Sequence, residues 1–234
     1  MLRKQLIFFD LGQTLIDEWA FMAHFDQKFL ELLNGFGARI DQRNYRAVRD
    51  SMIRDRKIEN GSVKELIVEM SRMLSPPGYD RVIAGRLEPQ IMENRLELFR
   101  PFDDAIPTLQ ALSKQYEMGL IANQSEDIIY LLEKWGLTRF FGVRAISSSV
   151  KLKKPDPRIF ELAIKQACRS AKDCIMVGDR LDTDMCPANE LGLTTIRITN
   201  SLFALQVPIQ ECERPDYTIE RLSEIASVIE SIIS

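Results

Sequence analysis

Apolar positions in this chain fall into short uninterrupted runs, and the stretches between most of them have helical spacing. Six runs predict strands, at residues 6–9, 118–122, 143–146, 174–177, 194–198 and 217–219. Continuous apolar runs of this length are typical of strands that are buried on both faces of a parallel sheet. The alternation of strands with helices therefore predicts an α/β fold whose core is a Rossmann-like parallel sheet with right-handed crossovers.

The region between the first and second predicted strands breaks this alternation. Helical spacing and capping residues predict four helices there, one through Phe21, Phe25 and Phe29, one after Asp41, one after Ser62 and one over residues 79–98 with a bend at Pro89. No strand pattern interrupts them. We therefore predict an all-helical domain of residues 17–100, inserted into an α/β core that is made of residues 1–16 and 101–234.

The composition of the chain restricts which binding partners and which cellular compartment we expect. The chain has 234 residues, of which 45% are apolar and 28% charged, and a formal net charge of -3. This balance gives no electrostatic reason to expect a nucleic acid or an anionic membrane as partner. No apolar stretch approaches the roughly 20 residues of a membrane span, and none has the form of a signal peptide. We expect a cytoplasmic protein, and the oligomeric state is left open.

The four cysteines occur late in the chain, at positions 168, 174, 186 and 212, without a CxxC pair. This spacing predicts neither a zinc site nor a disulfide framework.

Polar residues that could bind a ligand or take part in catalysis directly follow the predicted strands. Asp10 ends the first strand, Asn123 and Gln124 follow the second, and Asp179 follows the fourth. Because ligands bind beyond the carboxyl ends of strands in open α/β sheets, we expect these side chains at one rim. Lys154, from the loop after the third strand, is expected at the same rim.

Carboxylates crowded together at that rim would need a cation. Two like charges about 4 Å apart repel by about 4 kcal/mol at an effective dielectric constant near 20. Hard oxygen ligands without a neighbouring histidine or cysteine favour Mg²⁺. Asp10, Asp179 and Asp184 are the candidate ligands, and Lys154 would hold an anionic substrate. Asp182 is interpreted as a surface carboxylate. The alternative for Asp10 is a residue at a strand end that makes only turn hydrogen bonds.

Four segments resemble a known family. Residues 10–15 (DLGQTL), 120–123 (LIAN), 154–157 (KPDP) and 177–184 (VGDRLDTD) are similar, in this order, to the four motifs of the haloacid dehalogenase-like hydrolase superfamily. The helical insert between the first two motifs resembles the family's C1 cap. The resemblance extends over nearly the whole chain.

The resemblance implies an Mg²⁺-dependent hydrolase of small phosphorylated molecules. Asp10 would attack phosphorus to form an aspartyl-phosphate, and Lys154 would contact both the nucleophile and the phosphoryl group. The implied metal ligands are Asp10, the backbone carbonyl of Gly12, Asp179 and Asp184. The implied substrate-binding residues are Thr14, Asn123, Gln124 and Lys154.

Two positions depart from the pattern of the family's phosphatases. Gly12 stands where these enzymes carry a second aspartate, which protonates the leaving group and then activates water. A general acid contributes about 10²- to 10⁴-fold, so we expect a preference for good leaving groups. Asp17 and Glu18 are the nearest candidate replacements. Ala122 stands where a serine or threonine hydroxyl meets the phosphate.

These departures keep two alternatives open. Family members that cleave carbon–halogen or carbon–phosphorus bonds also lack the second aspartate. A protein that binds ligands or regulates, and that has lost turnover, would likewise tolerate Gly12 and Ala122.

Overall fold

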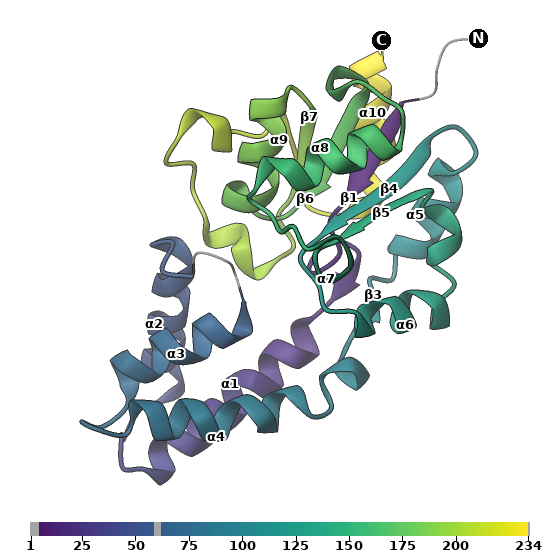
Figure 1. Cartoon of the computed structure of the whole chain (residues 1–234). Helices are drawn as coiled ribbons and strands as arrows, with labels where there is room; N and C mark the ends of the chain where they lie inside the picture. The colour runs from purple at the N-terminus through teal and green to yellow at the C-terminus, as the bar shows by residue number, and fades with distance from the viewer. Residues whose placement is uncertain (1–4, 59–61, 234) are drawn as a thin grey trace. The chain divides into compact units, whose positions relative to one another are not determined.

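The computed structural model describes residues 5–58 and 62–233. The chain divides into two compact units, which are described separately (Figure 1). One unit combines the N-terminal segment up to Asp17 with the chain from Arg100 onward, and the other is Glu18–Phe99.

The first unit is built on a six-stranded sheet in which every neighbouring pair is parallel. Its strands are β1 (Leu6–Phe9), β4 (Glu117–Ala122), β5 (Val143–Ile146), β6 (Cys174–Gly178), β7 (Thr194–Ile198) and β8 (Tyr217–Ile219). Their order is β5-β4-β1-β6-β7-β8, which places β1 between β4 and β6. All six strands predicted from the apolar runs are confirmed, as is the α/β class.

Helices cover this sheet on both faces. They are α5 (Ala105–Leu112), α6 (Asp127–Lys134), α7 (Ser147–Val150), α8 (Pro157–Gln166), α9 (Cys186–Leu191) and α10 (Ile225–Ile233). On one face, Phe8 packs in a buried cluster with Phe160 of α8 and Ala188 of α9. Successive strand residues point to opposite faces, and Ile7 and Phe9 are fully buried on the other face. Double-sided burial explains the uninterrupted apolar runs.

Two short strands were not predicted from the sequence. β2 (Ile16–Asp17) and β3 (Arg100–Pro101) pair antiparallel where the chain leaves and re-enters the α/β unit. The Arg100 side chain crosses this pair, and its Nε donates to Asp17 Oδ2 at 2.9 Å. Strands of two residues are too short to produce a periodic apolar pattern.

The second unit contains only helices among its described residues. They are α1 (Trp19–Gly35), α2 (Gln42–Arg54), α3 (Val63–Leu74), α4 (Asp80–Met92) and a 3₁₀ turn at Arg95–Leu98. Asp41 and Ser62 cap α2 and α3 as predicted, through bonds from Asn44 N and Glu65 N. The predicted helix over residues 79–98 was too long, because Asn94 leaves helical geometry and separates α4 from the 3₁₀ turn.

The cysteine interpretation was wrong in one respect. Cys186, at the start of α9, forms a disulfide with Cys212, and their Cα atoms are 4.4 Å apart. The two residues are separated by 26 positions, so no short motif marks the pair in the sequence. The disulfide joins α9 to the segment that leads to β8.

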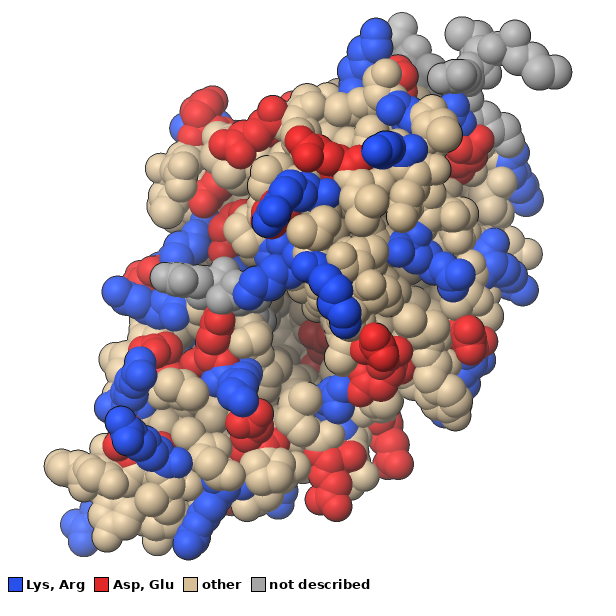
Figure 2. All heavy atoms as spheres, viewed as in Figure 1, with Lys and Arg blue, Asp and Glu red and all other residues tan. Residues whose placement is uncertain are grey.

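The described surface carries charges of both signs. Basic and acidic side chains are interspersed over the face shown in Figure 2. Among the helices of the described chain, none combines the length and apolar character that crossing a membrane requires.

Candidate active site

Asp10 emerges from the centre of the sheet. β1 pairs with β4 and β6 up to Phe9, and the Asp10 amide still donates to Val177 O at 2.9 Å. The next residues turn sharply, so the carboxylate is delivered at the carboxyl end of the strand. Only 9% of Asp10 is exposed.

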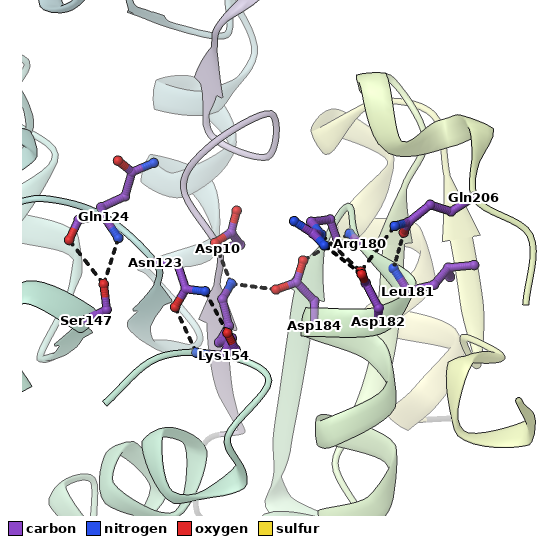
Figure 3. A network of polar contacts seen from close by, with 10 residues as sticks. All are labelled: Asp10, Asn123, Gln124, Ser147, Lys154, Arg180, Leu181, Asp182, Asp184 and Gln206. Atoms are coloured by element: carbon purple, nitrogen blue, oxygen red, sulfur yellow. Dashed lines mark hydrogen bonds and ion pairs between the residues drawn. The ribbon is translucent and has the colours of Figure 1, made fainter. Parts of the chain in front are cut away.

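Lys154 lies beside it. Lys154 is 2% exposed, and its ammonium donates to carboxylate oxygens of both Asp10 and Asp184 (Figure 3). A buried ammonium would be costly without partners, and these two carboxylates satisfy it. Burial opposes the charged form, but the negative charges of Asp10 and Asp184 outweigh it and raise the pKa of Lys154. The raised pKa favours the charged form of Lys154 at this position.

Asn123 holds the backbone of Lys154 in place. Its Nδ2 donates to Lys154 O at 2.8 Å, and its Oδ1 accepts from Lys154 N at 2.8 Å. Both ends of the side-chain amide are thus used within the protein. The side chain therefore fixes the loop that carries the lysine, and the assignment of Asn123 to substrate binding stays a prediction.

Two further carboxylates come from the end of β6. Asp179 follows Gly178 directly and is 2% exposed, and Asp184 is 1% exposed on the next turn. Asp184 Oδ2 accepts from Arg180 N at 3.0 Å. A Cβ at Gly178 would lie 2.5 Å from Asp184 Oδ2, so only glycine leaves room for this carboxylate.

The three aspartates form one acidic cluster. Asp10, Asp179 and Asp184 each offer an oxygen within 4.8 Å of the others. Burial, opposed by Lys154, raises the pKa of Asp10 to about 6. Burial and the charges of Asp184 and Asp10 raise the pKa of Asp179 well above its usual range. One lysine therefore does not compensate three buried carboxylates.

The cluster fits a hard divalent cation. Asp179 Oδ2 is buried and has no hydrogen-bond partner in the described structure. All three potential ligands are carboxylates, the donor type that Mg²⁺ prefers, and no histidine or cysteine joins them in this group.

The other sequence-predicted residues differ in their surroundings. Gly12 forms an isolated bridge with Ile16 in the loop after β1. Thr14 is 1% exposed, and its Oγ1 has no hydrogen-bond partner among the described residues. The backbone N–H of Gln124 donates to Ser147 Oγ at 3.1 Å, whereas the Gln124 side chain extends away from Lys154 in Figure 3.

Neither candidate replacement for the missing acid gains support. Asp17 is buried, and its Oδ2 accepts from both Arg100 Nε and Nη2, at 2.9 and 2.8 Å. Its geometry is that of an ion pair across β2 and β3. Glu18 belongs to the helical unit.

Several polar residues around Asp179 and Asp184 were missed by sequence reasoning. Asp182, interpreted as a surface carboxylate, is half-buried and accepts from Arg180 Nε at 3.0 Å and Gln206 Nε2 at 3.2 Å. Arg197 is 8% exposed within the apolar run of β7. An arginine inside a buried strand was the one available sequence signal, since such a charge requires partners.

Known proteins resemble this chain along most of its length. The chain is 30% identical to the glyceraldehyde 3-phosphate phosphatase of Methanopyrus kandleri, over 60% of this chain and 61% of that protein. It is 25% identical to the glyceraldehyde 3-phosphate phosphatase of Methanocaldococcus jannaschii, over 97% of both. The first match thus spans less than two thirds of the relative, and the second spans nearly all of it.

Solved structures with a similar fold include proteins of the same kind. The crystal structure of an HAD phosphatase from Thermococcus onnurineus superposes with a TM-score of 0.62 and 22% identity, covering 97% of this chain and 98% of that one. At this identity the likeness concerns the fold alone. The family model described as haloacid dehalogenase-like hydrolase matches residues 7–198, from β1 through β7. The protein therefore belongs to the haloacid dehalogenase-like hydrolases.

Proposed function

We propose that this enzyme is an Mg²⁺-dependent phosphatase of small phosphorylated molecules. The observation that carries the proposal is the contact of one buried lysine with two of three clustered aspartates at the carboxyl end of the sheet. A phosphoryl group brings negative charge, and a site with one lysine and one divalent cation would attract it. The names of the relatives support a phosphate ester as substrate.

Asp10 is assigned as the nucleophile. With a pKa of about 6, its carboxylate is largely ionised at neutral pH. An oxygen of this carboxylate would attack phosphorus, and the bond from phosphorus to the leaving-group oxygen would break. An aspartyl-phosphate would form and the alcohol, phenol or carboxylate would be released. Water would then attack the same phosphorus, which releases inorganic phosphate and regenerates Asp10.

Lys154 would hold the phosphoryl group while it is transferred. Its ammonium already touches the Asp10 carboxylate, so it can also neutralise charge on phosphoryl oxygens next to it. Asn123 would act through Lys154 by fixing its backbone. Thr14 Oγ1, buried without a partner, is a candidate donor to the substrate.

The residues assigned to Mg²⁺ are Asp10, Asp179 and Asp184, with the backbone carbonyl of Gly12. When bound, Mg²⁺ would screen the repulsion between these carboxylates and the incoming phosphate. This assignment favours phosphoryl transfer over carbon–halogen cleavage, because the dehalogenases of the family that this chain resembles need no metal.

Gly12 limits the range of leaving groups. Without a carboxylic acid at this position, the leaving oxygen departs without a proton from residue 12. Aryl and acyl phosphates, whose leaving groups are stable as anions, should therefore react faster than alkyl phosphates. Protonation by the substrate's own phosphoryl group or by solvent would leave a slower reaction for alkyl esters.

The test is phosphate release from a panel of aryl, acyl and alkyl phosphates, with glyceraldehyde 3-phosphate among them. We expect turnover that requires Mg²⁺, is abolished in Asp10→Asn, and is fastest for aryl and acyl phosphates. Release that is unaffected by Asp10→Asn or by chelation would contradict the mechanism. No release from any member of the panel would favour the ligand-binding alternative.

A further inference from the structure

A segment after β7 packs against the stretch that joins Asp179 to Asp184. It begins at Ser201, continues through the 3₁₀ turn Leu202–Leu205 and ends at Gln206. Gln206 is 2% exposed, so its side-chain amide lies in the interior and requires partners.

Both ends of the Gln206 amide bond to this stretch. Gln206 Oε1 accepts from Leu181 N at 3.0 Å, and Gln206 Nε2 donates to Asp182 Oδ1 at 3.2 Å (Figure 3). Leu181 N belongs to the first turn of a helical segment, where backbone amides lack a partner within the helix. Gln206 satisfies this donor and fixes the neighbouring carboxylate at the same time.

Arg197 fixes the backbone of Gln206 in turn. Its Nη2 donates to Phe203 O at 2.7 Å and to Gln206 O at 3.1 Å, and its Nε donates to Asp179 O at 3.4 Å. The Arg180 guanidinium lies 4.4 Å from the centre of the Phe203 ring. Arg197 therefore joins the segment of residues 201–206 directly to the backbone of Asp179.

We propose that Gln206 is a positioning residue for the metal site, an inference that rests on the proposed function because it assumes the Mg²⁺ ligands assigned above. Gln206 contacts residues 181 and 182, which lie between Asp179 and Asp184. Mg²⁺ requires near-octahedral geometry, so the relative placement of the two carboxylates determines its affinity. A neutral amide is suited to this position, since it supplies both an acceptor and a donor without adding a negative charge to the cluster.

The test measures Mg²⁺ binding to the full chain by isothermal titration calorimetry, without substrate. Gln206→Met removes both hydrogen bonds and should weaken Mg²⁺ binding by about 10- to 100-fold, the usual effect of losing an outer partner of a metal ligand. Gln206→Asn, whose side chain is too short to reach both partners, should weaken it in the same direction with less disturbance of packing.

Asn189 provides the matched control. Its Nδ2 donates to Cys212 O at 2.7 Å and Arg214 O at 2.8 Å, and its Oδ1 accepts from Thr195 Oγ1 at 2.9 Å. These side-chain bonds anchor a later part of the same loop, and their partners lie outside residues 179–184. Asn189→Leu should lower the unfolding temperature but leave the affinity for Mg²⁺ unchanged.

Each outcome has one meaning. Weaker Mg²⁺ binding in both Gln206 variants, with unchanged binding in Asn189→Leu, supports the positioning role. Unchanged binding in the Gln206 variants, or equal losses in Gln206 and Asn189 variants, overturns it while leaving the proposed function intact. Failure of the unmodified chain to bind Mg²⁺ contradicts the proposed function itself and this inference with it.

Discussion

The side-chain amide of Asn123 forms two hydrogen bonds with the backbone of Lys154. Asn123 Nδ2 donates to Lys154 O, and Asn123 Oδ1 accepts from Lys154 N, at 2.8 Å each. The lysine is the cation that contacts Asp10, and its backbone comes from a loop rather than from a strand. The position of its ammonium therefore depends on a side chain from the neighbouring strand end.

Asn123→Ala should lower kcat about 10- to 100-fold, because a lysine that moves by a fraction of an ångström no longer stabilises the transferring group. Steady-state kinetics with an aryl phosphate checks this. Asn34 is the matched control, since its amide makes the same pair of bonds to Ile40 in the helical unit, at 2.9 and 2.8 Å. An equal loss of kcat in Asn34→Ala would contradict a local effect at Lys154.

Gly178→Ala should disrupt the acidic cluster, although it replaces none of the charged residues. The added Cβ would lie 2.5 Å from Asp184 Oδ2, so the carboxylate has to move. We expect Mg²⁺ binding and turnover to fall at least about 10-fold. Gly142→Ala is the control, because a Cβ there meets no atom within 4 Å. Wild-type Mg²⁺ affinity in Gly178→Ala would show that the space at Gly178 is not needed.

The sequence predicted the parts of the site that stand at strand ends. Asp10 and Asp179 follow short uninterrupted apolar runs, and parallel strands bring their carboxyl ends to one edge. The contacts of Asn123 were less accessible, because an asparagine after a strand can bind a ligand or a neighbouring loop equally well. Gln206 gave no signal, since its partners, at residues 181 and 182, are 24 or more positions away.

Long-range pairings explain the remaining differences in the fold. β2 and β3 have two residues each, and the Asp17–Arg100 ion pair joins residues 83 positions apart. The Cys186–Cys212 disulfide likewise depends on how β7 and the following loop return to α9. Local pattern determines which segments are strands, but not which distant side chains meet.

The metal-free protein should lose stability as the pH rises from about 4 to about 6. Burial raises the pKa of Asp10 from 3.8 to about 6, so the folded state binds this proton more tightly than the unfolded state. The stabilisation is complete below the unfolded value and disappears above the folded one. A shift of this size corresponds to about 3 kcal/mol in the free energy of unfolding.

Urea unfolding in EDTA at a series of pH values measures this effect. Asp10→Asn removes the titrating group and should flatten the dependence, with the raised pKa of Asp179 leaving a residual slope. Mg²⁺ should flatten it as well, by favouring the ionised carboxylates. An undiminished slope in Asp10→Asn would assign the titration to another group.

Reduction of the Cys186–Cys212 disulfide should destabilise the α/β unit. Closing a loop across 26 residues restricts the unfolded chain and contributes about 3 kcal/mol in the chain-entropy model. Denaturant unfolding with and without reductant, and of the double variant Cys186→Ser/Cys212→Ser, measures the loss. Cys168→Ser is the control, because Cys168 is exposed and free. A stability that is insensitive to reductant would show that the disulfide contributes nothing to the folded state.

Gly12→Asp should restore proton transfer to the leaving group. An aspartate at this position would supply the acid that the family's phosphatases carry, and general acid catalysis is worth about 10²- to 10⁴-fold. We expect kcat/KM for an alkyl phosphate to rise at least about 10-fold, while that for an aryl phosphate changes little because its leaving group needs no proton. The ratio of the two rates should therefore narrow.

Gly12→Asn separates the proton from the shape of the side chain. Asparagine fills the same space as aspartate but cannot donate a carboxylic proton, so the ratio of aryl to alkyl rates should stay at its original value. The gain in Gly12→Asp should also disappear at high pH, as the new carboxylic acid loses its proton. Equal gains in both variants would attribute the effect to loop conformation, and no gain in either would show that the leaving group already receives its proton from elsewhere.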